Sequence, residues 1–273
     1  MHGAIFAPYI ERWRLLPDGA PITTPAAHLL PVRRDGAPAM LKVVTLDEAK
    51  PGNSLLAWWE GQGAARVYEM DGDAILMERA LGTRSLVEYA RNGRDDEATR
   101  ILCDAVAALH APRAKPNPEL VSLDVWFAPL SPVARTHGGL LARADVAARA
   151  LLAEPRDVVP LHGDIHHENV LDFGARGWLA IDPHAILGER AFDYANIFCN
   201  PDLGDPALGV ARDPARFRRR LAIVAEHASI ERHRLAQWIL AWCGLSAAWF
   251  IDDGMSAEID LAIAELAVAE IAD

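Results

Sequence analysis

Hydrophobic and polar residues alternate in short runs over the first eighty positions, and turn residues separate these runs. Asp35 and Gly36 divide an apolar run at 28–34 from a second run at 38–44. An Asp-Gly pair between alternating runs is a strong local signal for a β-hairpin, because both residues tolerate the backbone angles of a tight turn. The pattern therefore predicts two paired antiparallel strands here.

A second pair of short runs, at 65–69 and 74–78, flanks Asp71 and Gly72 in the same way and predicts another hairpin. Between the two hairpins, residues 55–61 have the apolar spacing of a short helix. The first part of the chain is thus predicted to be an antiparallel sheet with one inserted helix.

The pattern changes after Gly82, where apolar residues begin to recur at helical spacing. A β-rich lobe, residues 1–80, is predicted to meet an α-rich lobe, residues 81–273. The elements predicted in the second lobe are a helix from Ser85, helices over 99–110 and 134–154, strands at 158–161 and 177–181, and helices from Asp213 to the end.

Hydrophobic residues make up 51% of the 273 positions and charged residues 24%, a composition that excludes a disordered or fibrous protein. No uninterrupted apolar run reaches the roughly 20 residues that span a bilayer, so the chain is predicted to be cytoplasmic. The cysteines lie far apart in apolar sequence and are predicted to be buried reduced thiols rather than a disulfide framework. They are Cys103, Cys199 and Cys243.

The formal net charge is -11, from 27 basic and 38 acidic residues. This charge disfavours nucleic acid and anionic membranes as partners, because like charges repel, and it favours a cationic small molecule. Many proteins are acidic for solubility alone, so charge does not identify the partner. A monomer or a homodimer is expected.

Several side chains able to bind a metal or accept a proton are concentrated at 161–171, between apolar flanks. One hypothesis uses Asp164 as the carboxylate that accepts a proton from a substrate hydroxyl, and Asn169 as an uncharged oxygen ligand for a divalent cation. Asp182 follows the apolar run 179–181. A loop, a strand, a tight return and another strand would bring these three side chains to one edge, where their oxygens suit Mg²⁺ and nucleotide phosphates.

An alternative hypothesis, of a different class, makes the imidazole-rich part of this segment a zinc or dinuclear metal centre in a hydrolase. It leaves Asn169 and Asp182 without a role and gives no reason for the β-rich first lobe. Its ligands would be His162, Asp164, His166 and His167.

The His-Gly-Asp sequence at 162–164, Asn169, and the Ile-Asp-Pro sequence at 181–183 resemble the catalytic and metal-binding loops of the aminoglycoside phosphotransferases. The similarity is sharpest over 161–201 and greatest to the streptomycin 6-kinase and hydroxyurea kinase branch. It implies an α+β, two-lobed protein-kinase-like fold with a small antiparallel β-rich N-lobe and a larger α-helical C-lobe.

The same resemblance implies ATP and Mg²⁺ as cofactors and transfer of the γ-phosphoryl group to a hydroxyl of a streptomycin-like aminoglycoside, a reaction of antibiotic resistance. Hydroxyurea or a sugar metabolite is the alternative acceptor within this fold. A pseudokinase that only binds nucleotide is a further alternative, against which the joint presence of Lys42, Asp164, Asn169 and Asp182 argues.

In the second lobe, the resemblance assigns the general base to Asp164, the metal ligands to Asn169 and Asp182, and structural support to His162 and Asp193.

In the first lobe, it implies that Lys42 contacts the nucleotide phosphates and pairs with a glutamate on the inserted helix, for which Glu60 is the candidate. Thr23 and Thr24 stand where protein kinases have a glycine-rich phosphate loop, and this chain lacks the glycine repeat. The backbone groups that contact adenine are implied at Glu78 and Ala80.

A cationic acceptor would be bound by carboxylates and by tryptophan ring faces of the second lobe. Tryptophans at helical spacing also fit an ordinary buried helix face, so both interpretations stay open. The candidates are Glu189, Asp202, Asp205, Asp252 and Asp253 for the carboxylates, and Trp238, Trp242 and Trp249 for the rings.

Overall fold

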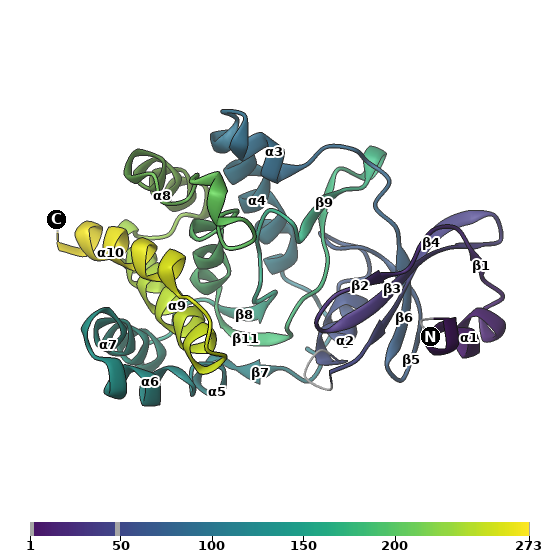
Figure 1. The fold of residues 1–273 in the computed structure, drawn as a ribbon, viewed down its shortest axis with the longest axis horizontal. Helices are drawn as coiled ribbons and strands as arrows, with labels where there is room; N and C mark the ends of the chain where they lie inside the picture. Colours follow the sequence, from purple (N-terminus) through teal and green to yellow (C-terminus); the bar gives the residue numbers. More distant parts are fainter. Residues whose placement is uncertain (1–2, 47–49, 273) are drawn as a thin grey trace.

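An antiparallel sheet builds the first lobe (Figure 1). The computed structural model describes residues 3–46 and 50–272. The strand order is β1-β3-β4-β6-β5, and β2 pairs with β3 outside this path. The strands are β1 Leu16–Pro17, β2 Ile22–Thr23, β3 Ala27–Arg34, β4 Ala37–Val44, β5 Val67–Asp71 and β6 Ala74–Glu78.

Both predicted hairpins are confirmed. Strands β3 and β4 pair over their whole length, and Asp35 (φ 50°) and Gly36 (φ 80°) form the turn between them. Two successive positive φ angles are what a type I′ turn requires, and this turn matches the twist of paired strands. Strands β5 and β6 form the second hairpin around Gly72.

Helix α1 (Gly3–Arg12), which the pattern did not predict, covers the outer face of this sheet. Its Phe6 is 1% exposed and belongs to an apolar cluster with residues of β3, β4 and β6. Tyr9, Ile10 and Trp13 continue the helical spacing and pack against the same cluster. The spacing was obscured by Pro8, because proline normally ends or kinks a helix.

Helix α2 (Lys50–Trp58) lies on the opposite face, between the sheet and the second lobe (Figure 1). Leu55 and Leu56 are buried in the main core with residues of β6. The helix predicted over 55–61 therefore exists, but its bounds were wrong. It ends at Trp58, since the chain turns at Glu60, where φ is 53°.

Helices dominate the second lobe, where α9 packs against α7, α10 and the 3-10 segment η3. α9 is long and apolar enough to cross a membrane, but 72% of its most apolar window is buried inside the protein. The helix predicted over 134–154 is in fact two helices, because Gly138 and Gly139 take positive φ and interrupt it. The helices are α3 Leu86–Arg91, α4 Asp95–His110, α5 Leu123–Trp126, α6 Leu130–His137, α7 Gly139–Ala153, η2 Gly174–Arg176, η3 Arg190–Phe198, η4 Pro206–Leu208, α8 Pro214–Ala228, α9 Arg232–Asp252 and α10 Glu258–Ala272.

Two small sheets complete the second lobe and confirm the strands predicted at 158–161 and 177–181. Strand β8 (Val158–Leu161) pairs with β11 (Ile186–Glu189), which also pairs with β7 (Val121–Ser122). Strands β9 (Val170–Asp172) and β10 (Trp178–Ala180) form a hairpin.

Backbone hydrogen bonds join this β9–β10 hairpin to the segment that precedes β5. The amide of Ala65 donates to the carbonyl of Ala180 at 2.9 Å, and the amide of Ala180 donates to the carbonyl of Gly63 at 3.0 Å. The sheet of the first lobe and the loops of the second are thereby held next to each other.

The three cysteines are buried and free, as predicted. Burial raises the pKa of Cys103 to about 12, which keeps its thiol protonated and unreactive at neutral pH.

Candidate active site

The loop over residues 162–169 connects β8 to β9, and Asp193 of η3 holds its backbone. The Asp193 carboxylate is buried and accepts hydrogen bonds from the backbone amides of His162 (2.9 Å) and Gly163 (2.7 Å). The ring Nε2 of His110, on α4, donates a third hydrogen bond at 2.8 Å. Two elements of the second lobe, η3 and α4, therefore fix the course of the 162–169 loop.

Position 163 accepts only glycine. Its φ is 85°, and a Cβ atom there would lie 2.6 Å from Cδ1 of Ile186 and 3.1 Å from Cβ of His184. The chain turns at Gly163, between His162, which is buried, and Asp164, whose side chain is 34% exposed.

His162 acts as a structural residue in the buried part of the loop. Its Nε2 donates to the carbonyl of Ile181 at 2.7 Å, and its Nδ1 accepts from the amide of Asp164 at 3.2 Å. The ring also stacks on Trp59, with centroids 6.1 Å apart. Burial lowers the pKa of His162, so the neutral imidazole links the 162–169 loop to the end of β10.

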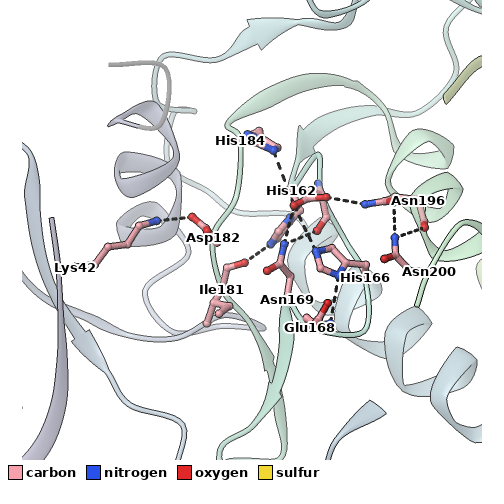
Figure 2. Close-up of polar contacts among 11 residues, drawn as sticks. Lys42, His162, His166, Glu168, Asn169, Ile181, Asp182, His184, Asn196 and Asn200 are labelled. Carbon is pink, nitrogen blue, oxygen red and sulfur yellow. Dashed lines mark hydrogen bonds and ion pairs between the residues drawn. The ribbon is translucent and has the colours of Figure 1, made fainter. Parts of the chain in front are cut away.

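Two asparagine side chains, Asn169 and Asn196 (labelled in Figure 2), orient the carboxylate of Asp164. The amide of Asn196 donates to Oδ1 at 2.6 Å. The amide of Asn169 donates to Oδ2 at 2.8 Å and to the backbone carbonyl of Asp164 at 2.9 Å. Both amide hydrogens of Asn169 are used within the loop, which leaves its carbonyl oxygen as the atom able to bind a cation.

Asn196 had no role in the sequence-based prediction. It follows Asp193 by three residues on η3, and residues three apart in a 3-10 helix share one face. The amide of Asn200 donates to Oδ1 of Asn196 at 2.8 Å, which directs the Asn196 amide nitrogen toward Asp164. The Asp-x-x-Asn spacing was the available signal.

Two histidines approach Oδ2 of Asp164: Nε2 of His166 at 3.5 Å and Nε2 of His184 at 4.0 Å. Burial favours a higher pKa for Asp164, but the charges of the surrounding histidines, His166 first, outweigh it and leave the pKa lowered. The carboxylate is therefore ionised at neutral pH and able to accept a proton. Burial opposes charge on His166 too, yet Asp164 raises the pKa of His166.

Lys42 and Asp182 form an ion pair between the sheet and the second lobe. Lys42 is 5% exposed on β4, and a buried ammonium requires an anionic partner. Asp182 follows β10 with a φ of 61°. The expected pairing of Lys42 with Glu60 was wrong, because Glu60 lies beyond the end of α2 and pairs with Lys115 at 2.7 Å.

Asn169 and Asp182 offer the neutral and anionic oxygens that Mg²⁺ prefers. The carboxylate of Asp182 is 54% exposed. The backbone amide of Ile181 donates to the backbone carbonyl of Asn169 at 2.9 Å. This bond keeps the segment that carries Asp182 next to the end of the 162–169 loop. The donor chemistry of these residues therefore fits a Mg²⁺ ion that arrives with a nucleotide.

The geometry does not support the zinc hydrolase hypothesis. Within residues 3–46 and 50–272, no group of three or more His, Cys, Asp and Glu side chains is placed to hold a metal ion. His162 uses both ring nitrogens inside the loop. His167 is 2% exposed, and burial lowers its pKa well below the usual value.

Thr23 and Thr24 lie exposed at the turn between β2 and β3. The amide of Thr24 donates to the carbonyl of Ala27 at 2.9 Å, and its hydroxyl accepts from the amide of Ala27 at 3.1 Å. The hydroxyl of Thr23 lies 3.2 Å from Nδ1 of His28. Hydrogen bonds local to the hairpin thus shape this turn.

Glu78 and Ala80 lie where the chain leaves the sheet for the second lobe. The carboxylate of Glu78 accepts from the amide of Arg66 at 3.2 Å and pairs with Arg176, so its side chain has a structural use. Ala80 packs against a small apolar cluster. That cluster contains Ala65, Phe173 and Leu179.

Four of the candidate acceptor residues are buried structural residues, so these assignments were wrong. Glu189 is 3% exposed, pairs with Arg234, and accepts from Nε1 of Trp238 at 2.9 Å. Asp202 is fully buried and accepts backbone hydrogen bonds from the loop that precedes α8. Trp238 and Trp242 lie in the core at 0% and 5% exposure.

Asp205, Asp252 and Asp253 are exposed. Asp205 caps η4 by accepting from the amide of Ala207 at 3.0 Å. Asp252 and Asp253 stand at the end of α9, one turn after the half-buried Trp249.

A β-rich lobe, an α-rich lobe, and an Asp-Asn-Asp set at their junction define a phosphotransferase of the kinase-like fold that acts on an alcohol group. A family model described as "Aminoglycoside/hydroxyurea antibiotic resistance kinase" matches residues 12–254. The chain belongs to this family.

Individual relatives agree with this assignment. The chain is 56% identical to the streptomycin 3''-kinase of Klebsiella pneumoniae over 262 residues, which cover 94% of this chain and 98% of that protein. It is 32% identical to the streptomycin 6-kinase of Streptomyces griseus over 284 residues, covering 98% and 88%. The crystal structure of aminoglycoside phosphotransferase APH(4)-Ia aligns with a TM-score of 0.69 at 14% identity, covering 100% and 99%. The predicted fold and family are confirmed, and identity is higher to the 3''-kinase than to the 6-kinase.

Proposed function

We propose that this protein transfers the γ-phosphoryl group of ATP to a hydroxyl of streptomycin or a closely similar cationic aminoglycoside. The observation that carries the proposal is the Asp164 carboxylate, which Asn169 and Asn196 orient and which solvent reaches. The relative with 56% identity is named a streptomycin 3''-kinase, so the 3'' hydroxyl is the position we propose.

In this mechanism Asp164 is the general base. It takes the proton of the acceptor hydroxyl as that oxygen forms its bond to the γ-phosphorus and the bond to the leaving ADP oxygen breaks. Asn169 and Asp182 would hold Mg²⁺, which when bound neutralises charge on the phosphates. Lys42 would then exchange its ion pair with Asp182 for contact with the phosphates.

The hinge after β6 is the proposed adenine site. Backbone groups of Glu78 and Ala80 would bind the purine edge, while the apolar cluster against which Ala80 packs would contact the ring. Thr23 and Thr24 would cover the phosphates from the β2–β3 turn. We further propose that the lobes comprise residues 1–80 and 81–273, and that the protein works in the cytoplasm.

The exposed carboxylates of Asp205, Asp252 and Asp253, together with the net charge of -11, favour a cationic acceptor. Attraction between exposed charges is screened beyond a Debye length of about 8 Å at physiological salt. The KM for streptomycin should therefore rise with ionic strength, whereas the KM for a neutral acceptor should not.

The test is ATP consumption by the purified protein with streptomycin, hydroxyurea and neutral sugars as separate acceptors, with and without Mg²⁺. Phosphorus NMR of the product locates the modified hydroxyl. Phosphorylated streptomycin is the expected product, and Asp164→Asn is the inactive control. Turnover of hydroxyurea or a sugar with none of streptomycin would reject the proposed acceptor. Turnover of streptomycin at another hydroxyl would reject only the position.

A further inference from the structure

Three aromatic rings lie in a chain of contacts that begins beside the Asp164 carboxylate. The ring of His184 lies 5.1 Å from that of Trp126, and the ring of Trp126 lies 5.6 Å from that of Trp249. The first ring places its Nε2 4.0 Å from Oδ2 of Asp164. We call His184, Trp126 and Trp249 the aromatic wall.

The aromatic wall differs from the core tryptophans in its access to solvent. Trp238 and Trp242 are 0% and 5% exposed, whereas the His184 side chain is 41% exposed and the two wall tryptophans are half-buried. Val125, which directly precedes Trp126, is 64% exposed, and Met255, six residues after Trp249, is 53% exposed.

Polar groups also belong to the elements that carry the aromatic wall. Nε1 of Trp126 is buried and has no hydrogen-bond partner within the described residues. Asp252 follows Trp249 by three positions on the same face of α9, and Asp253 is the C-cap residue directly after it. Ring faces bordered by exposed carboxylates form an environment that attracts a guanidinium or ammonium group.

We propose that the aromatic wall receives a cationic group of the acceptor while the reacting hydroxyl lies at Asp164. This subsite rests on the function proposed above and deepens it. Trp126 and Trp249 determine specificity through their ring faces, and Asp252 and Asp253 supply the outer negative charge. The proposal gives a role to a chain of partly exposed aromatic rings that leads from the general base.

The test measures steady-state kinetics of Trp126→Leu and Trp249→Leu with streptomycin as the varied acceptor. Each change should raise the KM for streptomycin by roughly 3- to 20-fold, the range of a lost cation–π contact. The kcat and the KM for ATP should stay within about twofold, because contacts made equally in ground and transition states affect KM alone. Trp126→Phe and Trp249→Phe keep a ring and should stay within about threefold.

Trp13→Leu is the matched control, since Trp13 is also half-buried but packs on the outer face of the first lobe. Its KM for streptomycin should equal that of the wild type. The two positions are tested separately, and thermal melts identify a variant that does not fold. An unchanged KM in the folded leucine variants, or an equal rise in the KM for ATP, would overturn the aromatic wall alone. A wild-type protein that does not phosphorylate streptomycin would overturn the proposed function and the wall with it.

Discussion

Asp193 and Asp260 are both buried carboxylates of the second lobe, and their surroundings are opposite. Asp193 accepts two backbone amides and one imidazole N–H, and it holds the 162–169 loop. Asp260, in the first turn of α10, is fully buried, and neither of its oxygens has a hydrogen-bond partner within the described residues. Burial raises the pKa of Asp260 to about 7.

The comparison shows what makes a buried carboxylate useful. Donors that converge on Asp193 turn it into a fixed anchor from which the catalytic residues are positioned. Without such donors, a buried carboxyl group of the same type becomes a source of pH-dependent instability.

The largest effect is expected for Asp164→Asn, the residue that the Asp193 anchor positions. Loss of the general base should lower kcat by roughly 10² to 10⁴-fold, while nucleotide affinity stays nearly unchanged, because the proton moves only in the transition state. Steady-state kinetics and ADP titration measure the two quantities.

Glu168→Gln makes the same chemical change on an exposed side chain of the same loop and serves as the control. An Asp164→Asn protein with more than about a tenth of the wild-type kcat would contradict the assignment of the base.

Asp193→Asn should remove the carboxylate that holds the backbone of the 162–169 loop. An amide group in place of the carboxylate directs N–H toward backbone N–H groups, so we expect the free energy of unfolding to fall by about 2–5 kcal/mol and kcat to fall with it. Urea unfolding and turnover measure the two effects. Asp205→Asn, on the exposed η4 cap, should change unfolding far less. Equal stability of Asp193→Asn and wild type would show that the anchor is not needed.

Asp260→Asn should change how stability depends on pH. The folded-state pKa of Asp260 is raised to about 7, so its favourable contribution is complete below the unfolded pKa near 4 and is lost as pH rises through 7. The wild type should lose up to about 4 kcal/mol of stability between pH 4 and pH 8 from this group. In the variant this loss should be absent. Thermal melts at pH 5 and pH 8 measure the difference, and parallel pH profiles for the two proteins would refute it.

Asp182→Ala should have the smallest effect, on nucleotide binding with metal present. We expect Mg²⁺-ADP affinity to fall by about tenfold, or about 1.4 kcal/mol, while affinity for ADP without Mg²⁺ changes little. Calorimetric titrations with and without Mg²⁺ measure both affinities. Unchanged affinity in the presence of Mg²⁺ would remove Asp182 from the proposed metal site.

Local patterns allowed much of the fold to be predicted. The two hairpins follow from Asp-Gly pairs between alternating runs, which are encoded within a few residues. Helix α1 was missed because Pro8 interrupts its amphipathic spacing, and packing against the sheet compensates for the proline. Tertiary packing regularly overrides such local signals.

The site residues also form two groups, those that a local motif identifies and those that depend on distant partners. Asp164 and Asn169 belong to one short loop, so the sequence motif identified them together. The structural roles of Glu189 and Trp238 depend on partners that lie far away in the chain, and a single sequence does not reveal these partners. The sequence also gave no sign that Glu60 would pair with Lys115, since that contact depends on where α2 ends.

The backbone hydrogen bonds at Ala180 bear on whether the chain could be cut into two separate lobes. Ala180 exchanges backbone hydrogen bonds with Gly63 and Ala65, so a cut after residue 80 would leave donors and acceptors in both pieces without partners. We therefore expect each fragment alone to be less stable than the same residues in the intact chain. The β9–β10 hairpin and the segment before β5 supply each other's hydrogen-bond partners, so we expect the two pieces to be more stable together than apart.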